Sequence, residues 1–294
     1  MFERPEENDQ QMPLRIVFLS VEGNVTESNY FKYIEKYRDV LNIKKSVHVH
    51  ALSRAKNDNL SAPDQVLELL EEYVEIRNSD ILPQKLKDLI PSTYSDEFLK
   101  QYLENQDAID EDLRKDFESH LYLAGIDLDY AWFLKEYSGE FDKFGVVVDR
   151  DYRSHTVKQL NKVWEECKKK NYEFFIINPC IEFWLLCHIL DVKDIYKDRL
   201  SCFRDNKSIS ENHNFTSKEL SFFAEHAKKI SEEKFKEYYL HNIDYAINQI
   251  KTSFSTDIKE LIGTNDSKDS EKRMLGSNLP KLFELLREDF RKSL

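Results

Sequence analysis

The chain has 294 residues and a formal net charge of −12. Its residues are 40% hydrophobic and 13% aromatic, a content that argues against wholesale disorder. No apolar stretch approaches the ~20 residues of a transmembrane helix, and the acidic N-terminus does not resemble a signal peptide. We therefore expect a cytoplasmic protein that does not enter a membrane. The four cysteines form no C-x-x-C pair, so the sequence supports neither a zinc ribbon nor a thioredoxin motif.

The predicted elements alternate between strand and helix on both sides of one interruption. Residues 1–13 are expected to form a flexible leader. The periodicity predicts strands at about 14–21, 46–52, 144–148 and 172–177, and helices at 26–41, 61–77, 156–170 and 180–190. Beyond residue 193 the chain is polar and mostly helical, at about 217–236, 238–254 and 279–292, with a loop at 263–270. Such alternation implies parallel strands joined by right-handed crossovers.

The interruption, residues 80–142, carries most of the negative charge. It holds 16 acidic and 6 basic residues, a net charge of −10, which leaves the rest of the chain close to −2. The overall charge therefore does not exclude a nucleic-acid-binding face elsewhere. Helical periodicity without convincing strands predicts a helical insertion, whose acidic surface is either simply solvated or repels competing polyanions. We expect an α/β fold with a mainly parallel sheet built from 14–79 and 143–195, followed by a mostly helical region at 196–294.

Acidic residues follow two of the predicted strands. Glu22-Gly23 closes the first, and Asp149-x-Asp151 closes the third. Ligands of open α/β sheets gather at the carboxyl ends of the strands, and converging carboxylates repel one another unless a cation joins them. Carboxylates, water and phosphate are the usual ligands of magnesium. The sequence thus predicts a Mg²⁺ (or Mn²⁺) site. Glu27 is either a further ligand or an acid that stabilises the start of its helix.

Nearby cations are candidates for holding a substrate phosphate. These are Arg150, Arg153 and Lys143, although the two arginines could instead neutralise the aspartates.

Two further residues have less certain roles. Glu182 is the only acid in an otherwise apolar helix. His188 lies about 120° further round that helix, so the two cannot easily share a ligand, and a role in the core is favoured for the histidine. His155 is of interest because it follows the aspartates closely, but the histidine spacing does not indicate a zinc site.

Four segments carry a resemblance to a known family. The stretch from Glu22-Gly23 to Tyr30-Phe31, the stretch Val147–Asp151 and the stretch Asn178–His188 resemble three motifs of the RloB-like family, in the family's order. Leu275-Gly276-Ser277-Asn278-Leu279-Pro280-Lys281-Leu282 is similar to a weaker C-terminal element. The resemblance covers roughly residues 14–55 and 143–195.

The resemblance implies a Toprim-like fold and metal-dependent phosphodiester chemistry. The family is similar to a branch of the Toprim superfamily, in which a Glu and an Asp-x-Asp bind divalent metal for phosphodiester chemistry. That implies metal ligation by Glu22, Asp149 and Asp151. The family also implies a place in anti-phage abortive-infection operons, often beside an AAA-type ATPase. The acidic insertion at 80–142 departs from the family's pattern.

Our working hypothesis is a metal-dependent nuclease that cuts RNA, such as tRNA, or DNA. An AAA-type ATPase is the expected partner, and a homo-oligomer is left open. Two alternatives remain: a non-catalytic interaction subunit of an ATPase complex, and another metal-dependent phosphotransfer enzyme.

Overall fold

The computed structural model describes residues 14–23, 25–52, 62–78, 87–124, 139–210, 213–226, 229–264 and 274–293. The leader predicted at 1–13 and most of the loop predicted at 263–270 lie outside these residues. The chain divides into two compact units: a smaller one of residues 1–11, 54–60 and 68–140, and a larger one of residues 12–53, 61–67 and 141–294. Much of the predicted insertion thus falls in the smaller unit.

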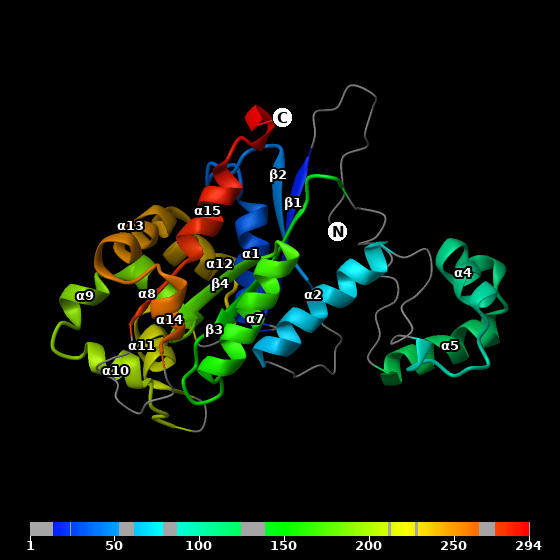
Figure 1. The fold of residues 1–294 in the computed structure, drawn as a ribbon, viewed down its shortest axis with the longest axis horizontal. Coiled ribbons are helices and arrows are strands. Elements are labelled where there is room, and N and C mark those ends of the chain that lie inside the picture. Colours follow the sequence, from blue (N-terminus) through cyan, green and yellow to red (C-terminus); the bar gives the residue numbers. More distant parts are fainter. Residues whose placement is uncertain are drawn as a thin grey trace. The chain divides into compact units, whose positions relative to one another are not determined.

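A five-stranded sheet organises the larger unit (Figure 1), with the order β2-β1-β3-β4-β5. The strands are β1 (Arg15–Val21), β2 (Val47–Ala51), β3 (Lys143–Asp149), β4 (Glu173–Asn178) and β5 (Gly276–Ser277). The first four pair in parallel and β5 pairs antiparallel with β4. The predicted α/β fold with a mainly parallel sheet is therefore confirmed. In the register, Val21 lies beside Val147 and Asp149 beside Ile177, which brings the carboxyl ends of β1, β3 and β4 together.

The strands are short β-branched and aromatic runs buried on both faces, as parallel strands require. On one face, side chains such as Val17, Leu19 and Val147 join the main core together with α1 (Thr26–Lys36), α8 (Ile181–Ile189), α13 (Ile243–Ser253) and α15 (Leu279–Arg287). Alternate strand residues point to the other face, where Ser20 donates a hydrogen bond of 2.6 Å to the carbonyl of Val66 in α2 (Pro63–Asn78). There α7 (Val157–Lys170) and α14 (Ile258–Ile262) contact each other and β4.

The C-terminal region is helical but more broken than predicted. The expected helix 217–236 is wrong: α11 (Phe215–Ala224) ends where Glu225 adopts φ +52°, a left-handed conformation that stops a helix. Similarly, α1 ends at Lys36 instead of residue 41. The remaining elements are short. They are α9 (Val192–Ile195), α10 (Leu200–Asp205), α12 (Glu232–Lys234), a π-turn (Phe235–Tyr239) and 3₁₀ turns (Leu240–Asn242 and Phe290–Ser293).

The C-terminal element 275–282 closes the edge of the sheet beside β4. Asn278 accepts a hydrogen bond from the Ile176 amide (2.7 Å) and donates one to the Phe174 carbonyl (2.7 Å). Ser277 donates a third, of 3.0 Å, to the Ile176 carbonyl. These bonds satisfy backbone groups that an open sheet edge would leave unpaired. The sequence showed no strand here, because two residues are too few to give a periodicity.

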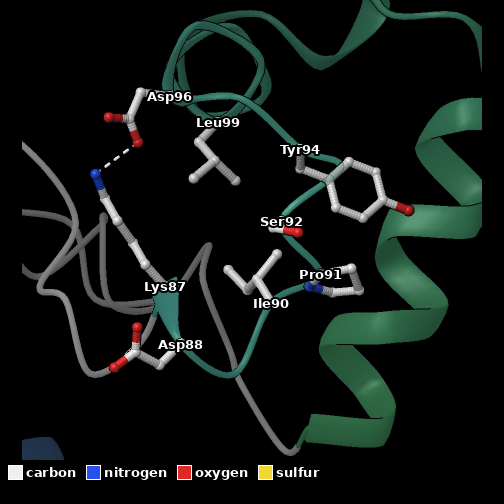
Figure 2. A pocket seen from close by; sticks show the side chains of 8 residues that line it. All are labelled: Lys87, Asp88, Ile90, Pro91, Ser92, Tyr94, Asp96 and Leu99. Carbon is white, nitrogen blue, oxygen red and sulfur yellow. Dashed lines mark hydrogen bonds and ion pairs between the residues drawn. The ribbon is translucent and has the colours of Figure 1, made fainter.

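The smaller unit contains α4 (Asp96–Glu104), a 3₁₀ turn (Gln106–Ala108) and α5 (Glu111–Ala124), so the described part of the insertion is helical as predicted. Its own core consists of Ile90, Leu99, Tyr102, Phe117 and Leu121. A pocket of about 500 Å³ opens beside this core (Figure 2), where Lys87 forms an ion pair of 2.5 Å with Asp96. Within the described residues, no helix is both long and apolar enough to traverse a bilayer.

Candidate functional site

Five carboxylates lie around the carboxyl ends of three adjacent strands. Glu22 follows β1 directly, and Glu27 lies in the first turn of the helix after it. Asp149 is the last residue of β3, and Asp151 is two positions further on. Glu182 lies in the first turn of α8, just after β4. All five belong to the larger unit.

Asp149 is the centre of this acidic group. Burial and the negative charges of four neighbours raise its pKa well above the usual aspartate value; the neighbours are Glu22, Glu27, Glu182 and Asp151, in decreasing order of effect. All of these charged neighbours are carboxylates, so each disfavours the ionised form. A partly buried acid among other acids is costly for folding and is typical of functional sites.

Glu22 is held at both of its carboxylate oxygens. Its Oε2 accepts a hydrogen bond of 2.9 Å from the backbone amide of Asp149. Its Oε1 lies 3.0 Å from Nε2 of His155, and the His155 side chain is 3% exposed. Thus the structure brings the Glu22 carboxylate into contact with the backbone amide of Asp149, 127 residues away in sequence, at the strand ends where the sequence analysis placed both residues.

His155 is the residue whose importance the sequence analysis underrated. A tight turn places it, since the amides of Ser154 and His155 both donate to the Asp151 carbonyl, at 3.0 and 2.9 Å. Burial lowers the pKa of His155, but the hydrogen bond to Glu22 and the charges of Glu22 and Asp151 outweigh burial and raise it. The only sequence signal was its closeness to the aspartates.

The Asp151 carboxylate accepts hydrogen bonds from the residues that directly follow it in the chain. Its Oδ1 accepts from the Arg153 amide (3.2 Å) and its Oδ2 from the Ser154 hydroxyl (2.7 Å). These bonds stabilise the turn that carries His155 back toward Glu22.

Arg150 does not suit the predicted phosphate-binding role. It is completely buried. Its Nε donates to the Ile262 carbonyl (2.7 Å), its Nη1 donates to the His155 carbonyl (2.6 Å), and the guanidinium stacks over the Tyr152 ring. The side chain between the two aspartates therefore points inward and ties the loop after β3 to α14.

Of the other two predicted phosphate ligands, Lys143 lies far from the acidic group and Arg153 lies beside it. Lys143 begins β3, and six residues of extended strand, about 20 Å, separate it from Asp149. The prediction for Lys143 is therefore wrong, because it lies at the opposite edge of the sheet. Arg153 is exposed beside Asp151, with its Nη1 3.1 Å from the Ser208 hydroxyl, and suits the role.

Glu27 lies over Gly23. The Glu27 side chain is buried, and a Cβ added at Gly23 would come within 1.9 Å of its Oε2. The glycine of the Glu-Gly motif therefore leaves the space that the second glutamate occupies.

This packing predicts that Gly23→Ala displaces the Glu27 carboxylate without breaking the fold. Shifts of about 1 Å near reacting groups can lower a rate about 10²-fold, and we expect a loss of that order in the cleavage activity that the sequence analysis predicts. In a Glu27→Ala background the same change should have little further effect, because its target is gone. Cleavage rates of the two single variants and the double variant measure this; independent, additive losses would contradict it.

His188 belongs to the core, as favoured from the sequence. Its Nδ1 lies 2.9 Å from the Trp184 carbonyl and its Nε2 3.2 Å from the Tyr30 hydroxyl, which in turn accepts from the Trp184 indole. This ring of bonds assigns the hydrogen to Nδ1 and suits the neutral imidazole. Burial accordingly lowers the pKa of His188 to about 4.

The His188 shift predicts a pH-dependent stability. The pKa is depressed in the folded state, so the stabilisation is complete above the unfolded value of about 6.5 and is lost as pH falls toward 4. The loss approaches about 3 kcal/mol. Urea unfolding of the natural chain and of His188→Phe between pH 7 and 4.5 should show their stability difference shrinking as the pH falls. A difference that does not change with pH would contradict the prediction. His50, with a similarly lowered pKa, contributes equally to both proteins.

The donor set suits a hard divalent cation, although it is not fully assembled. Among the described residues, no three His, Cys, Asp or Glu side chains are arranged closely enough to hold a metal ion by themselves. Mg²⁺ needs only one or two protein carboxylates, because it retains water and takes up substrate phosphate. Asp149, half-buried among carboxylates, is the residue whose charge such an ion would balance, with Glu22 beside it.

The fold and the site together define a class: an α/β protein with carboxylates at the carboxyl edge of a mainly parallel sheet. The sequence profile described as RloB-like protein matches residues 17–282, most of the chain. The chain belongs to the RloB-like protein family. No curated protein and no solved structure matches it.

Proposed function

We propose that this chain is a Toprim-type nuclease that hydrolyses phosphodiester bonds with the help of Mg²⁺ or Mn²⁺. The observation that carries the proposal is Asp149, a half-buried acid at a strand end whose charged neighbours are all carboxylates and whose backbone amide binds the Glu22 carboxylate. Such an arrangement is unfavourable by itself and becomes favourable when a divalent cation balances the negative charges; that cation can then also bind a substrate phosphate. The metal, when bound, polarises the phosphoryl oxygen and acidifies a water molecule.

The residues of the chain take the following roles. Asp149 and Asp151 supply oxygen ligands for the cation, and Glu27 is a candidate for a further one. Glu22 is either a ligand or the base that accepts a proton from the attacking water. Arg153, exposed beside Asp151, contacts the substrate phosphate.

RNA is the favoured substrate, DNA the second. The family membership supports a role in anti-phage abortive-infection defence in the cytoplasm, controlled by an AAA-type ATPase. The acidic helices α4 and α5 are a candidate contact for that partner, because they form a small module with its own core.

The test is cleavage of defined substrates by the purified chain. Transfer RNA, total RNA and single- and double-stranded DNA are incubated with Mg²⁺, with Mn²⁺ or with EDTA, each with and without the ATPase. We expect metal-dependent strand cleavage of at least one RNA, abolished by EDTA. Failure to cut any nucleic acid under all conditions would contradict the nuclease and favour a non-catalytic interaction subunit.

A further inference from the structure

We infer that His155 is a positioning residue that holds the Glu22 carboxylate in its working orientation, an inference that rests on the proposed function. It follows from how Glu22 is held. Both of its carboxylate oxygens are hydrogen-bonded by the short segment 149–155. The Asp149 amide donates to Oε2 at 2.9 Å, and His155 Nε2 lies 3.0 Å from Oε1. The pair of bonds fixes both the position and the plane of the carboxylate relative to Asp149.

His155 is buried and its backbone is held on both sides. The residue is 4% exposed. Its amide donates to the Asp151 carbonyl (2.9 Å), and its carbonyl accepts from the buried guanidinium of Arg150 (2.6 Å). The next residue, Thr156, caps α7 through its side chain. Backbone bonds on both sides of His155 therefore hold the main chain from which its imidazole reaches Glu22.

Among the described residues, the ring has one hydrogen-bond partner, and that partner is Glu22. Its other nitrogen, Nδ1, is buried and has no hydrogen-bond partner in the described part of the chain. A buried histidine with a purely structural role usually has both nitrogens bonded, as His188 does. Because an ionised carboxylate only accepts, Nε2 carries the hydrogen. The hydrogen bond that the His155 ring makes to the residues that the structure describes is thus an N–H directed at Glu22.

Loss of this donor leaves Glu22 held at one oxygen only. Groups that orient a metal ligand or a base typically change metal affinity or activity 10–100-fold when removed. Four variants test this for His155. His155→Phe keeps a ring and removes the donor. His155→Gln retains an N–H at a similar reach, His155→Asn has an amide too short to reach Glu22, and His241→Phe alters an exposed histidine as a control.

The readouts are kcat and KM for RNA cleavage with Mn²⁺, the affinity for Mn²⁺ alone by calorimetry, and thermal melting. We expect His155→Phe and His155→Asn to lower kcat or Mn²⁺ affinity about 10–100-fold, with KM for RNA nearly unchanged. His155→Gln should recover most of the loss, and His241→Phe should match the natural chain. Should His155→Phe not fold, the comparison of Gln with Asn decides.

Two results would overturn the inference. One is that folded His155→Phe or His155→Asn has the same kcat and the same Mn²⁺ affinity as the natural chain. The other is folded His155→Gln no better than His155→Asn. In either case the natural chain still binds Mn²⁺ and cuts, so the nuclease proposal stands. If the natural chain neither binds Mn²⁺ nor cuts, both proposals fail together.

Discussion

Replacing Asp149 with Asn is expected to abolish metal-dependent cleavage, with a rate loss of about 10³-fold or more. A metal at a phosphoryl group contributes several kcal/mol of charge stabilisation, which corresponds to a factor of that size. Glu22→Gln should cause a comparable loss, since the amide is a poor ligand and a poor base. Single-turnover cleavage of the best RNA substrate measures both variants.

A second signature separates loss of function from loss of fold. Asp149 is a half-buried acid whose charged neighbours are acids, so the metal-free Asp149→Asn protein should be at least as stable as the natural chain. Mn²⁺ should raise the melting temperature of the natural chain and not of the variant, because only a folded binding site is stabilised by its ligand. Asp198→Asn, at an exposed position, is the matched control and should cut normally. Cleavage at the natural rate by Asp149→Asn would refute the site.

Replacing Gly276 with Ala is expected to lower the free energy of unfolding more than any other substitution proposed above or below. Gly276 adopts φ +146°, and an added Cβ would lie 2.0 Å from the Ser255 carbonyl oxygen and 2.8 Å from the Ser255 nitrogen. The conformation costs a side chain about 1–3 kcal/mol. Overlap with backbone that cannot move aside adds about 1–3 kcal/mol or more. The change would also separate β5 from β4 and release the edge bonds made by Asn278.

Gly263 provides the control for that prediction. It also has a positive φ, +85°, but no atom of the described residues lies within 4 Å of an added Cβ. Gly263→Ala should therefore cost only the conformational strain, about 1–3 kcal/mol. Urea unfolding of both variants tests the difference. Equal losses would mean that close backbone approach at Gly276 contributes nothing.

Much of the site could be predicted because it lies at strand ends. Unbroken apolar runs marked β1 and β3, and an acid at the end of each could only meet at one edge of a parallel sheet. Lys143 could have been excluded by the same reasoning, since it begins the strand that Asp149 ends. The helix break at Glu225 had no such signal, because a left-handed residue other than glycine leaves little trace in the sequence.

Periodicity and chain order determined the sheet, its mainly parallel pairing and the meeting of Glu22 with Asp149, because these depend on local hydrophobic pattern and on the geometry common to all parallel sheets. Only the tertiary structure decided the roles of Arg150 and His155. Arg150 turns inward to a carbonyl 112 residues away, and His155 turns back to Glu22 from 133 residues away. Such contacts depend on side-chain direction and on groups brought close by folding, which no local pattern encodes.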